Sequence, residues 1–255
     1  MKLNGIDQLR KHLPELQTRN GTTRLMLIFL FWFALTIAFF YWVDLVIPEW
    51  MPDGEIVLIA LGFLVRALFY SRKKIYQQKY GELAYRNAFV RFATPGLGIL
   101  IGSIAHIGYM PGVEIPAVWW RPILVAVGIV FVIIGVALWI RGLLTFGADN
   151  VSLLYVYYPN EGKLINSNIY GILRHPIYAA ILYGGIGLGL MHTNWYALVV
   201  IVLLPLGFIG WTRLVEEKDL IERFPDYVNY RKRVPAFWVK PNNLGKFFRF
   251  LISGT

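Results

Sequence analysis

The sequence predicts an all-α integral membrane protein with about six transmembrane helices and a C-terminal cytoplasmic segment of helical or irregular structure. Of its 255 residues 57% are hydrophobic and only 16% are charged, which is too little polar surface for a soluble domain of this size. Several apolar runs are long enough to cross about 30 Å of hydrocarbon. Cations concentrate in alternate connections between these runs, as in a multi-pass membrane protein.

The six expected crossings follow from hydropathy. They fall near residues 24–46, 56–70, 93–110, 121–146, 176–191 and 195–212. The first is too long for a cleavable signal peptide and has no small-residue cleavage site. Neither an internal repeat nor a soluble domain is visible. We divide the chain into N-terminal transmembrane helices, 1–140, and a second region with a helical hairpin and a tail, 141–255.

The distribution of charge predicts the orientation in the membrane. Cations occupy the N-terminal segment, the connection after the second crossing and the tail; they include Lys2, Arg10, Lys11, Arg72, Lys73, Lys74, Lys218, Arg231, Lys232 and Arg233. The opposite connections are nearly free of them. By the positive-inside rule both termini are cytoplasmic, in an inner or plasma membrane. The net charge of +10 therefore points to membrane lipids as partners and not to nucleic acid. No obligate protein partner is evident.

Metal and thiol chemistry find no support in the sequence. The chain has no cysteine and four scattered histidines, so no zinc site is expected. His106 lies within the third crossing, where a hydrogen-bonded structural role is expected. Arg66, near the inner end of the second crossing, is expected to snorkel to the surface.

Polar residues gather on the cytoplasmic side, in the connection 141–175 and in the tail from 211 onward. The fifth and sixth crossings are joined only by "MHTNW", which predicts a tight helical hairpin. Such a hairpin places Arg174 and His175, before the fifth crossing, beside "TRLVEEKDL" after the sixth. Pro176 suits the first helical position, where a missing N–H costs nothing. Gly185 and Gly189 have the spacing of close helix packing.

Two interpretations of the segment after the sixth crossing stay open. Arg213 lies on one helix face with Glu216 and with Glu217, which suits an ordinary solvated i,i+4 pair. With the hairpin folded back, the same carboxylates suit a polar pocket that faces a cation, and ionisable groups at a membrane boundary are candidates for function. Asp149 and Asn150 either line this pocket or cap a helix. "IDQLRKHLPELQ" and "LGKFFRFLI" have the pattern of interfacial anchoring helices.

The second half of the chain resembles the isoprenylcysteine carboxyl methyltransferase and phospholipid N-methyltransferase family. The resemblance covers roughly residues 140–241 and depends on "YGILRHPIY", a short hairpin, a Glu-Glu pair and "FPDYVNYRKRVP". The matching residues are Tyr170, Arg174, His175, Pro176, Tyr178, Glu216, Glu217, Phe224, Tyr227, Tyr230, Val234 and Pro235. The chain departs from the family pattern at Ala180, at Asn168-Ile169 and at Pro225. These departures reshape the acceptor side of the loop without removing a charged residue.

The resemblance implies an S-adenosyl-L-methionine-dependent membrane methyltransferase whose acceptor is a lipid or other apolar molecule with a carboxylate, amine or thiol. Residues 1–140 would then form the acceptor side and 141–255 the catalytic region, with the C-terminal segment covering the cofactor pocket. Tyr170, His175, Pro176, Tyr178, Glu217, Tyr227 and Tyr230 would bind the cofactor. Arg174 and Arg213 would lie near the acceptor, and Glu216 or His175 could take a proton from an amine.

Two alternatives remain at this point. A membrane sterol or steroid reductase would bind NADPH through a basic segment such as "YRKRVP", although Glu216 and Glu217 would repel its phosphates. A transporter or scaffold would place its polar residues at the bilayer midplane and show repeats, and neither feature is seen here.

Overall fold

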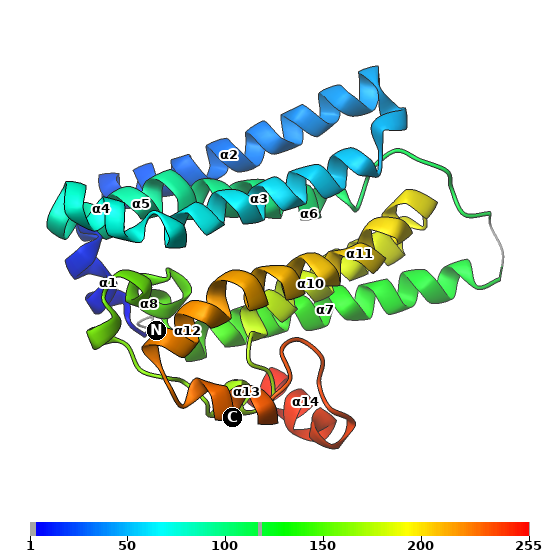
Figure 1. The fold of residues 1–255 in the computed structure, drawn as a ribbon. Helices are drawn as coiled ribbons and strands as arrows, with labels where there is room; N and C mark the ends of the chain where they lie inside the picture. Colours follow the sequence, from blue (N-terminus) through cyan, green and yellow to red (C-terminus); the bar gives the residue numbers. More distant parts are fainter. Residues whose placement is uncertain (1–3, 117–118, 255) are drawn as a thin grey trace.

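A computed structural model describes residues 4–116 and 119–254, so Lys2 lies outside the described residues. Six apolar helices run side by side (Figure 1): α2 Arg19–Val46, α3 Asp53–Ser71, α6 Thr94–His106, α7 Arg121–Phe146, α10 Pro176–His192 and α11 Trp195–Trp211. Five of the continuous helices are long and apolar enough to cross a membrane, and α10 is a shorter apolar helix. The predicted all-α architecture is therefore confirmed.

Two of the predicted crossings have different boundaries in the structure. The third belongs to a continuous helix from Lys73 to His106, so it begins well before residue 93 and ends before residue 110. Its first part comprises α4 Lys73–Tyr80, α5 Ala84–Ala88 and a π-helical turn, Phe89–Ala93. The sixth continues through a second π-helical turn, Thr212–Glu216, into α12 Glu217–Arg223. Polar residues end an apolar run without ending a helix, and hydropathy therefore misses both extensions.

The polar elements gather at one end of the bundle, where both termini also lie (Figure 1). They include α1 Ile6–His12, α8 Ala148–Val151, α9 Leu154–Tyr157, α13 Tyr227–Arg233 and α14 Leu244–Ser253. The amide of Ala148 donates to the carbonyl of Asn4 at 2.8 Å, which ties the N-terminus to the end of α7. Termini on one side agree with an even number of crossings.

Helix α10 packs closely on α7 because glycines line their contact. A Cβ on Gly187 would stand 2.6 Å from the carbonyl oxygen of Gly128, and one on Gly135 would stand 2.8 Å from that of Ala180. The predicted packing role of Gly185 and Gly189 is also confirmed, since both face side chains of α11. Small residues let the backbones approach where no hydrophobic force holds helices together in lipid.

His106 is buried at the opposite end of the bundle, where it joins three helices. Its Nδ1 lies 2.6 Å from Oε2 of Glu55 and its Nε2 lies 3.1 Å from Oδ2 of Asp44. Its ring stacks on that of Phe40 with centroids 4.0 Å apart. The predicted hydrogen-bonded structural role is confirmed.

Helix α14 lies against α7, with Phe247 and Phe250 buried and Ile252 exposed. Nε of Arg141 donates to the carbonyl of Leu251 at 3.3 Å. The anchoring of α1 and α14 at a membrane surface stays a prediction.

We expect Gly187→Ala to lower the free energy of unfolding by about 2 kcal/mol, because its methyl group would overlap the backbone of α7. Thermal unfolding of the purified protein in detergent measures this. Gly184→Ala is the matched control, since a Cβ there meets no atom within 4 Å. Equal unfolding temperatures for the two variants would contradict the proposed packing.

Candidate functional site

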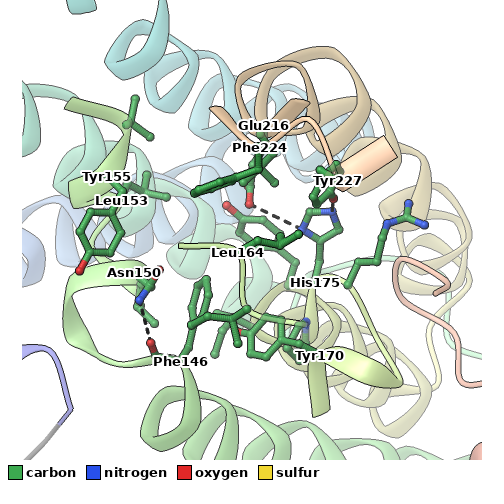
Figure 2. Close-up of a pocket in the computed structure, with 18 of the residues that line it drawn as sticks. Phe146, Asn150, Leu153, Tyr155, Leu164, Tyr170, His175, Glu216, Phe224 and Tyr227 are labelled. Carbon is green, nitrogen blue, oxygen red and sulfur yellow. Dashed lines mark hydrogen bonds and ion pairs between the residues drawn. The ribbon is translucent and has the colours of Figure 1, made fainter. Parts of the chain in front are cut away.

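A cavity opens at the polar end of the bundle, between α3, α7, α10 and α12 (Figure 2). It contains about 1040 Å³ of empty space, which includes a part open to solvent. Its apolar wall includes Leu97, Trp139, Phe146, Leu164, Ile177 and Ile181, and its polar and aromatic groups include Arg66, Tyr155, Lys163, Tyr170, His175, Glu216, Arg223, Phe224, Tyr227 and Tyr230.

One buried carboxylate, that of Glu217, joins the two sides of the hairpin. Its Oε1 accepts hydrogen bonds from Arg174 (Nη2, 2.8 Å; Nε, 3.2 Å), from Nε2 of His175 (3.1 Å) and from the hydroxyl of Tyr227 (3.2 Å). Its Oε2 lies 3.3 Å from Nη1 of Arg231. The predicted juxtaposition of Arg174-His175 with the segment after the sixth crossing is therefore confirmed.

The tail passes beside the same residues and bonds to their backbone. The amide of Arg174 donates to the carbonyl of Pro235 at 2.9 Å, and that of His175 donates to Ala236 at 3.2 Å. Nη1 of Arg174 also donates to the carbonyls of Arg231 and Val234. Both the backbone and the side chain of Arg174 are therefore bonded to the chain itself, although Arg174 also lines the cavity.

His175 stands between the two adjacent glutamates. Its Nδ1 is 3.6 Å from Oε1 of Glu216, and its Nε2 is 3.1 Å from Oε1 of Glu217. Burial lowers the pKa of His175, but hydrogen bonds to Glu216 and Glu217 outweigh it and raise the pKa above the ordinary value of 6.5. An imidazolium, with both ring nitrogens donating, is the form that this arrangement favours.

Glu216 is the carboxylate that faces the cavity (Figure 2). Its Oε2 accepts from Nε1 of Trp211 at 3.3 Å. The π-helical turn that ends at Glu216 widens the helix just before Glu217 begins α12. Two neighbouring carboxylates therefore serve different surroundings, one open to a ligand and one enclosed by the chain.

Tyr170 presents a buried hydroxyl that has no hydrogen-bond partner among the described residues. Its ring stacks on Phe146 with centroids 4.6 Å apart, and its carbonyl accepts a hydrogen bond of 2.5 Å from Tyr230. Burial raises the pKa of Tyr170 well above 10, so the hydroxyl keeps its proton and can donate it to a ligand. A buried polar atom of this kind needs a partner, and it faces the cavity.

Eight of the ten sequence-predicted site residues line the cavity: Tyr170, Arg174, His175, Pro176, Tyr178, Glu216, Tyr227 and Tyr230. Glu217 is enclosed by the chain's own cations. Arg213 is exposed on the outside of the helix. Because Arg213 is exposed and Glu217 is buried, the two do not form the solvated i,i+4 pair considered from the sequence.

Several residues of the cavity wall were not predicted; they come from the first half of the chain and from the connection 141–175. The predicted snorkelling of Arg66 is wrong: its side chain is buried, donates to the carbonyl of Ala93 and lies in the cavity wall. Asn150 combines the two roles left open for it. It lines the cavity, and its Nδ2 donates to the carbonyl of Phe146 at 2.9 Å.

The geometry defines an integral membrane protein with a ligand cavity at one end of its helices. Comparison with known proteins is more specific. Residues 123–226 match the family model described as phospholipid methyltransferase. The resemblance to the isoprenylcysteine carboxyl methyltransferase and phospholipid methyltransferase family, which the motifs predicted, is therefore supported over this part of the chain.

Individual relatives match over parts of their length. The cobalt-zinc-cadmium resistance protein CzcN of Cupriavidus metallidurans is 34% identical over 38% of this chain and 49% of its own length. Protein-S-isoprenylcysteine O-methyltransferase B of Arabidopsis thaliana is 27% identical, over 57% of this chain and 72% of its own. The protein-S-isoprenylcysteine O-methyltransferase of Mus musculus is 30% identical, over 48% and 43% respectively. The chain therefore spans only about half the length of some of these relatives. No solved structure matches it.

We expect Glu217→Gln to lower the free energy of unfolding by about 3 kcal/mol, because it leaves the cations of Arg174 and His175 without a buried counter-charge. In a domain of this size that corresponds to a fall of roughly 6–12 °C in unfolding temperature. Tryptophan fluorescence during heating measures it. Glu222→Gln, at an exposed position of the same helix, should change the temperature little. Similar unfolding temperatures for the two variants would contradict the role of Glu217 as the shared counter-charge.

A pH dependence follows from His175. Because its pKa is raised in the folded state, that state binds the proton more tightly, so the contribution to stability is present at about pH 6.5 and below. It is lost as pH rises through the folded pKa. The stability difference between wild type and His175→Gln should therefore shrink with rising pH. NMR titration of labelled histidine gives the midpoint, and a value at or below 6.5 would contradict the arrangement.

Proposed function

We propose that the protein is an S-adenosyl-L-methionine-dependent methyltransferase that acts on a lipid or other apolar acceptor at the membrane. The family match supports methyl transfer over the reductase, transporter and scaffold alternatives. The observation that carries the cofactor assignment is the buried, unpartnered hydroxyl of Tyr170 beside the carboxylate of Glu216 in one cavity.

The residues present fit this cofactor. A carboxylate suits its ammonium group, and Glu216 is the carboxylate that lines the cavity. Aromatic rings suit its adenine and its sulfonium, and Tyr170, Tyr227 and Phe224 line the same space. The N-terminal turn of α10, which begins at Pro176, points backbone N–H groups toward an anionic group. When bound, the cofactor supplies an electrophilic methyl group.

Glu217 and Arg174 are assigned as positioning residues in this proposal. Oε1 of Glu217 accepts from Arg174, and Arg174 also donates to the carbonyl of Val234, so the two residues hold the mouth of α10 against α12 and the tail. His175, Tyr178, Tyr227 and Tyr230 remain proposed contacts of the cofactor, and Pro176 shapes its side of the cavity. Arg213 has no proposed role at the acceptor, because it faces outward.

The acceptor is proposed to enter from the bilayer. The apolar wall formed by Leu97, Trp139, Ile177 and Ile181 would receive its hydrocarbon part and exclude water from the reacting groups. His175 is held as a proton donor and is a poor general base in that state. If the acceptor needs deprotonation, Glu216 is the remaining candidate; a carboxylate or thiolate acceptor needs none.

The active side is proposed to be cytoplasmic. The end of the bundle that holds the cavity carries the cation-rich connection 72–91 and the basic tail, and the positive-inside rule assigns such an end to the cytoplasm. The sequence-based division into an acceptor side, 1–140, and a catalytic region, 141–255, also remains a proposal. Arg66 and Leu97, from the first part, do line the cavity.

Equilibrium binding of S-adenosyl-L-methionine and of NADPH to the detergent-purified protein tests this function. We expect the first to bind and NADPH not to bind. Glu216→Gln should weaken binding of S-adenosyl-L-methionine about tenfold to a hundredfold, since a charge-assisted hydrogen bond is lost. Tyr170→Phe should weaken it without lowering the unfolding temperature, because the lost hydroxyl has no partner in the chain.

Tyr230→Phe provides the matched comparison for Tyr170→Phe. Its hydroxyl donates to the carbonyl of Tyr170, so removing it should cost about 1 kcal/mol of stability. NADPH binding alone would transfer the chain to the reductase alternative. If neither S-adenosyl-L-methionine nor NADPH binds, the proposed function is wrong.

A further inference from the structure

Arg66 is a buried cation in a helix that lies outside the matched family region. It belongs to α3, four residues before Tyr70, and its side chain is 6% exposed. It lines the same cavity as Glu216 and Tyr178. A guanidinium withdrawn from water at this depth carries a large desolvation cost, which a partner normally offsets.

The protein itself satisfies only part of this guanidinium. Of its five N–H donors, one reaches the carbonyl of Ala93 at 3.4 Å, and the group lies 5.6 Å from the centre of the Trp211 ring. No ion pair within 4 Å joins it to a carboxylate of the described residues, and Glu216 attracts it only from a greater distance across the cavity. Most of its hydrogen-bonding capacity is therefore left for a ligand in the cavity.

The neighbouring helix is built to admit this side chain. A Cβ on Gly96 would stand 2.5 Å from Cγ of Arg66 and 2.9 Å from its backbone nitrogen. Gly96 thus lets α6 approach α3 at the level of Arg66. The next residue, Leu97, belongs to the apolar wall of the cavity, so the cation lies where a polar head group would meet a hydrocarbon tail.

The other cations that line the cavity have partners or lie on a different element. Arg174 is paired with Glu217, and Arg223 is paired with Asp219 at 2.6 Å. Lys163 comes from the connection between α9 and α10. Glu216 is the one glutamate or aspartate in the described lining, and Trp211 and His175 already contact it. The charge of the cavity therefore favours an anionic ligand beyond the zwitterionic part of the cofactor.

We propose that Arg66 binds the anionic head group, a carboxylate or a phosphate, of the lipid acceptor and so selects acidic acceptors over amines. This inference rests on the proposed function and names its substrate class. A planar guanidinium can hold two oxygens of either group at once, and its attraction is strong where water is excluded. The ammonium form of an amine acceptor would be repelled from the same position.

The test uses the full chain in lipid nanodiscs and three radiolabelled probes with one sixteen-carbon tail: hexadecanoate, hexadecyl phosphate and hexadecylamine. Equilibrium binding of each is measured by scintillation proximity, with empty nanodiscs as background. Binding of S-adenosyl-L-methionine is measured on the same samples. The variants are Arg66→Gln, Arg66→Lys and, as matched control, Arg72→Gln, which removes an exposed arginine one residue past the end of α3.

The expected result is specific binding of one or both anionic probes. Arg66→Gln should weaken it about tenfold to a hundredfold and Arg66→Lys less, with S-adenosyl-L-methionine affinity within about twofold of wild type. Arg72→Gln should change neither. Which anionic probe binds distinguishes a carboxylate from a phosphate head group. If Arg66→Gln fails to fold, the Lys variant still reads out the loss of the bidentate geometry.

The inference is overturned if hexadecylamine binds as well as the anionic probes, if no probe binds, or if neither Arg66 variant alters binding. It is also overturned if Arg66→Gln weakens binding of S-adenosyl-L-methionine as much as binding of the probe, because the arginine would then belong to the cofactor site. If the wild-type protein does not bind S-adenosyl-L-methionine, the proposed function is refuted instead. Failure of this inference and failure of the proposed function are therefore distinguishable.

Discussion

The carboxylate of Glu217 is the interaction on which the polar end of this protein depends. A single oxygen accepts from Arg174, His175 and Tyr227, which come from the mouth of α10 and from α13. A charge this deeply buried needs partners, so this cluster of Glu217, Arg174, His175 and Tyr227, the Glu217 clamp, forms only with the hairpin closed and the tail in place. The shape of the cavity beside it is a consequence of that closure.

The Glu217 clamp also explains why residues of a catalytic-looking motif are bonded to the chain itself. "RHP" and "VP" are far apart in the sequence, yet the backbone N–H groups of Arg174 and His175 donate to the carbonyls of Pro235 and Ala236. The hydroxyl of Tyr230 adds a further bond between these two segments by donating to the carbonyl of Tyr170. Much of the family pattern therefore builds the wall of the pocket, and fewer residues are left to bind what enters it.

Hydropathy and charge were sufficient to predict six helices with both ends on one side, because lipid requires long apolar helices. The short "MHTNW" connection was sufficient to predict that Arg174 and His175 meet the glutamate pair. Which glutamate faces the ligand was not predictable, since the π-helical turn at Thr212–Glu216 has no signature in the local sequence. Arg66 was missed for another reason: an arginine in an apolar run is usually at the lipid surface, and only the tertiary contact with Gly96 shows that this one points inward.

The distribution of counter-charges separates structure from ligand binding. Glu217 and Asp219 are each committed to arginines of the chain, which fixes α12 against its neighbours. Glu216 and Arg66 have opposite charges, attract each other and both line the cavity. The ammonium group of a sulfonium cofactor would add a positive partner to Glu216, and an acidic acceptor would add a negative partner to Arg66. The charges of the cavity would thus position the cofactor and the acceptor before the methyl group is transferred. An in-line methyl transfer requires this positioning.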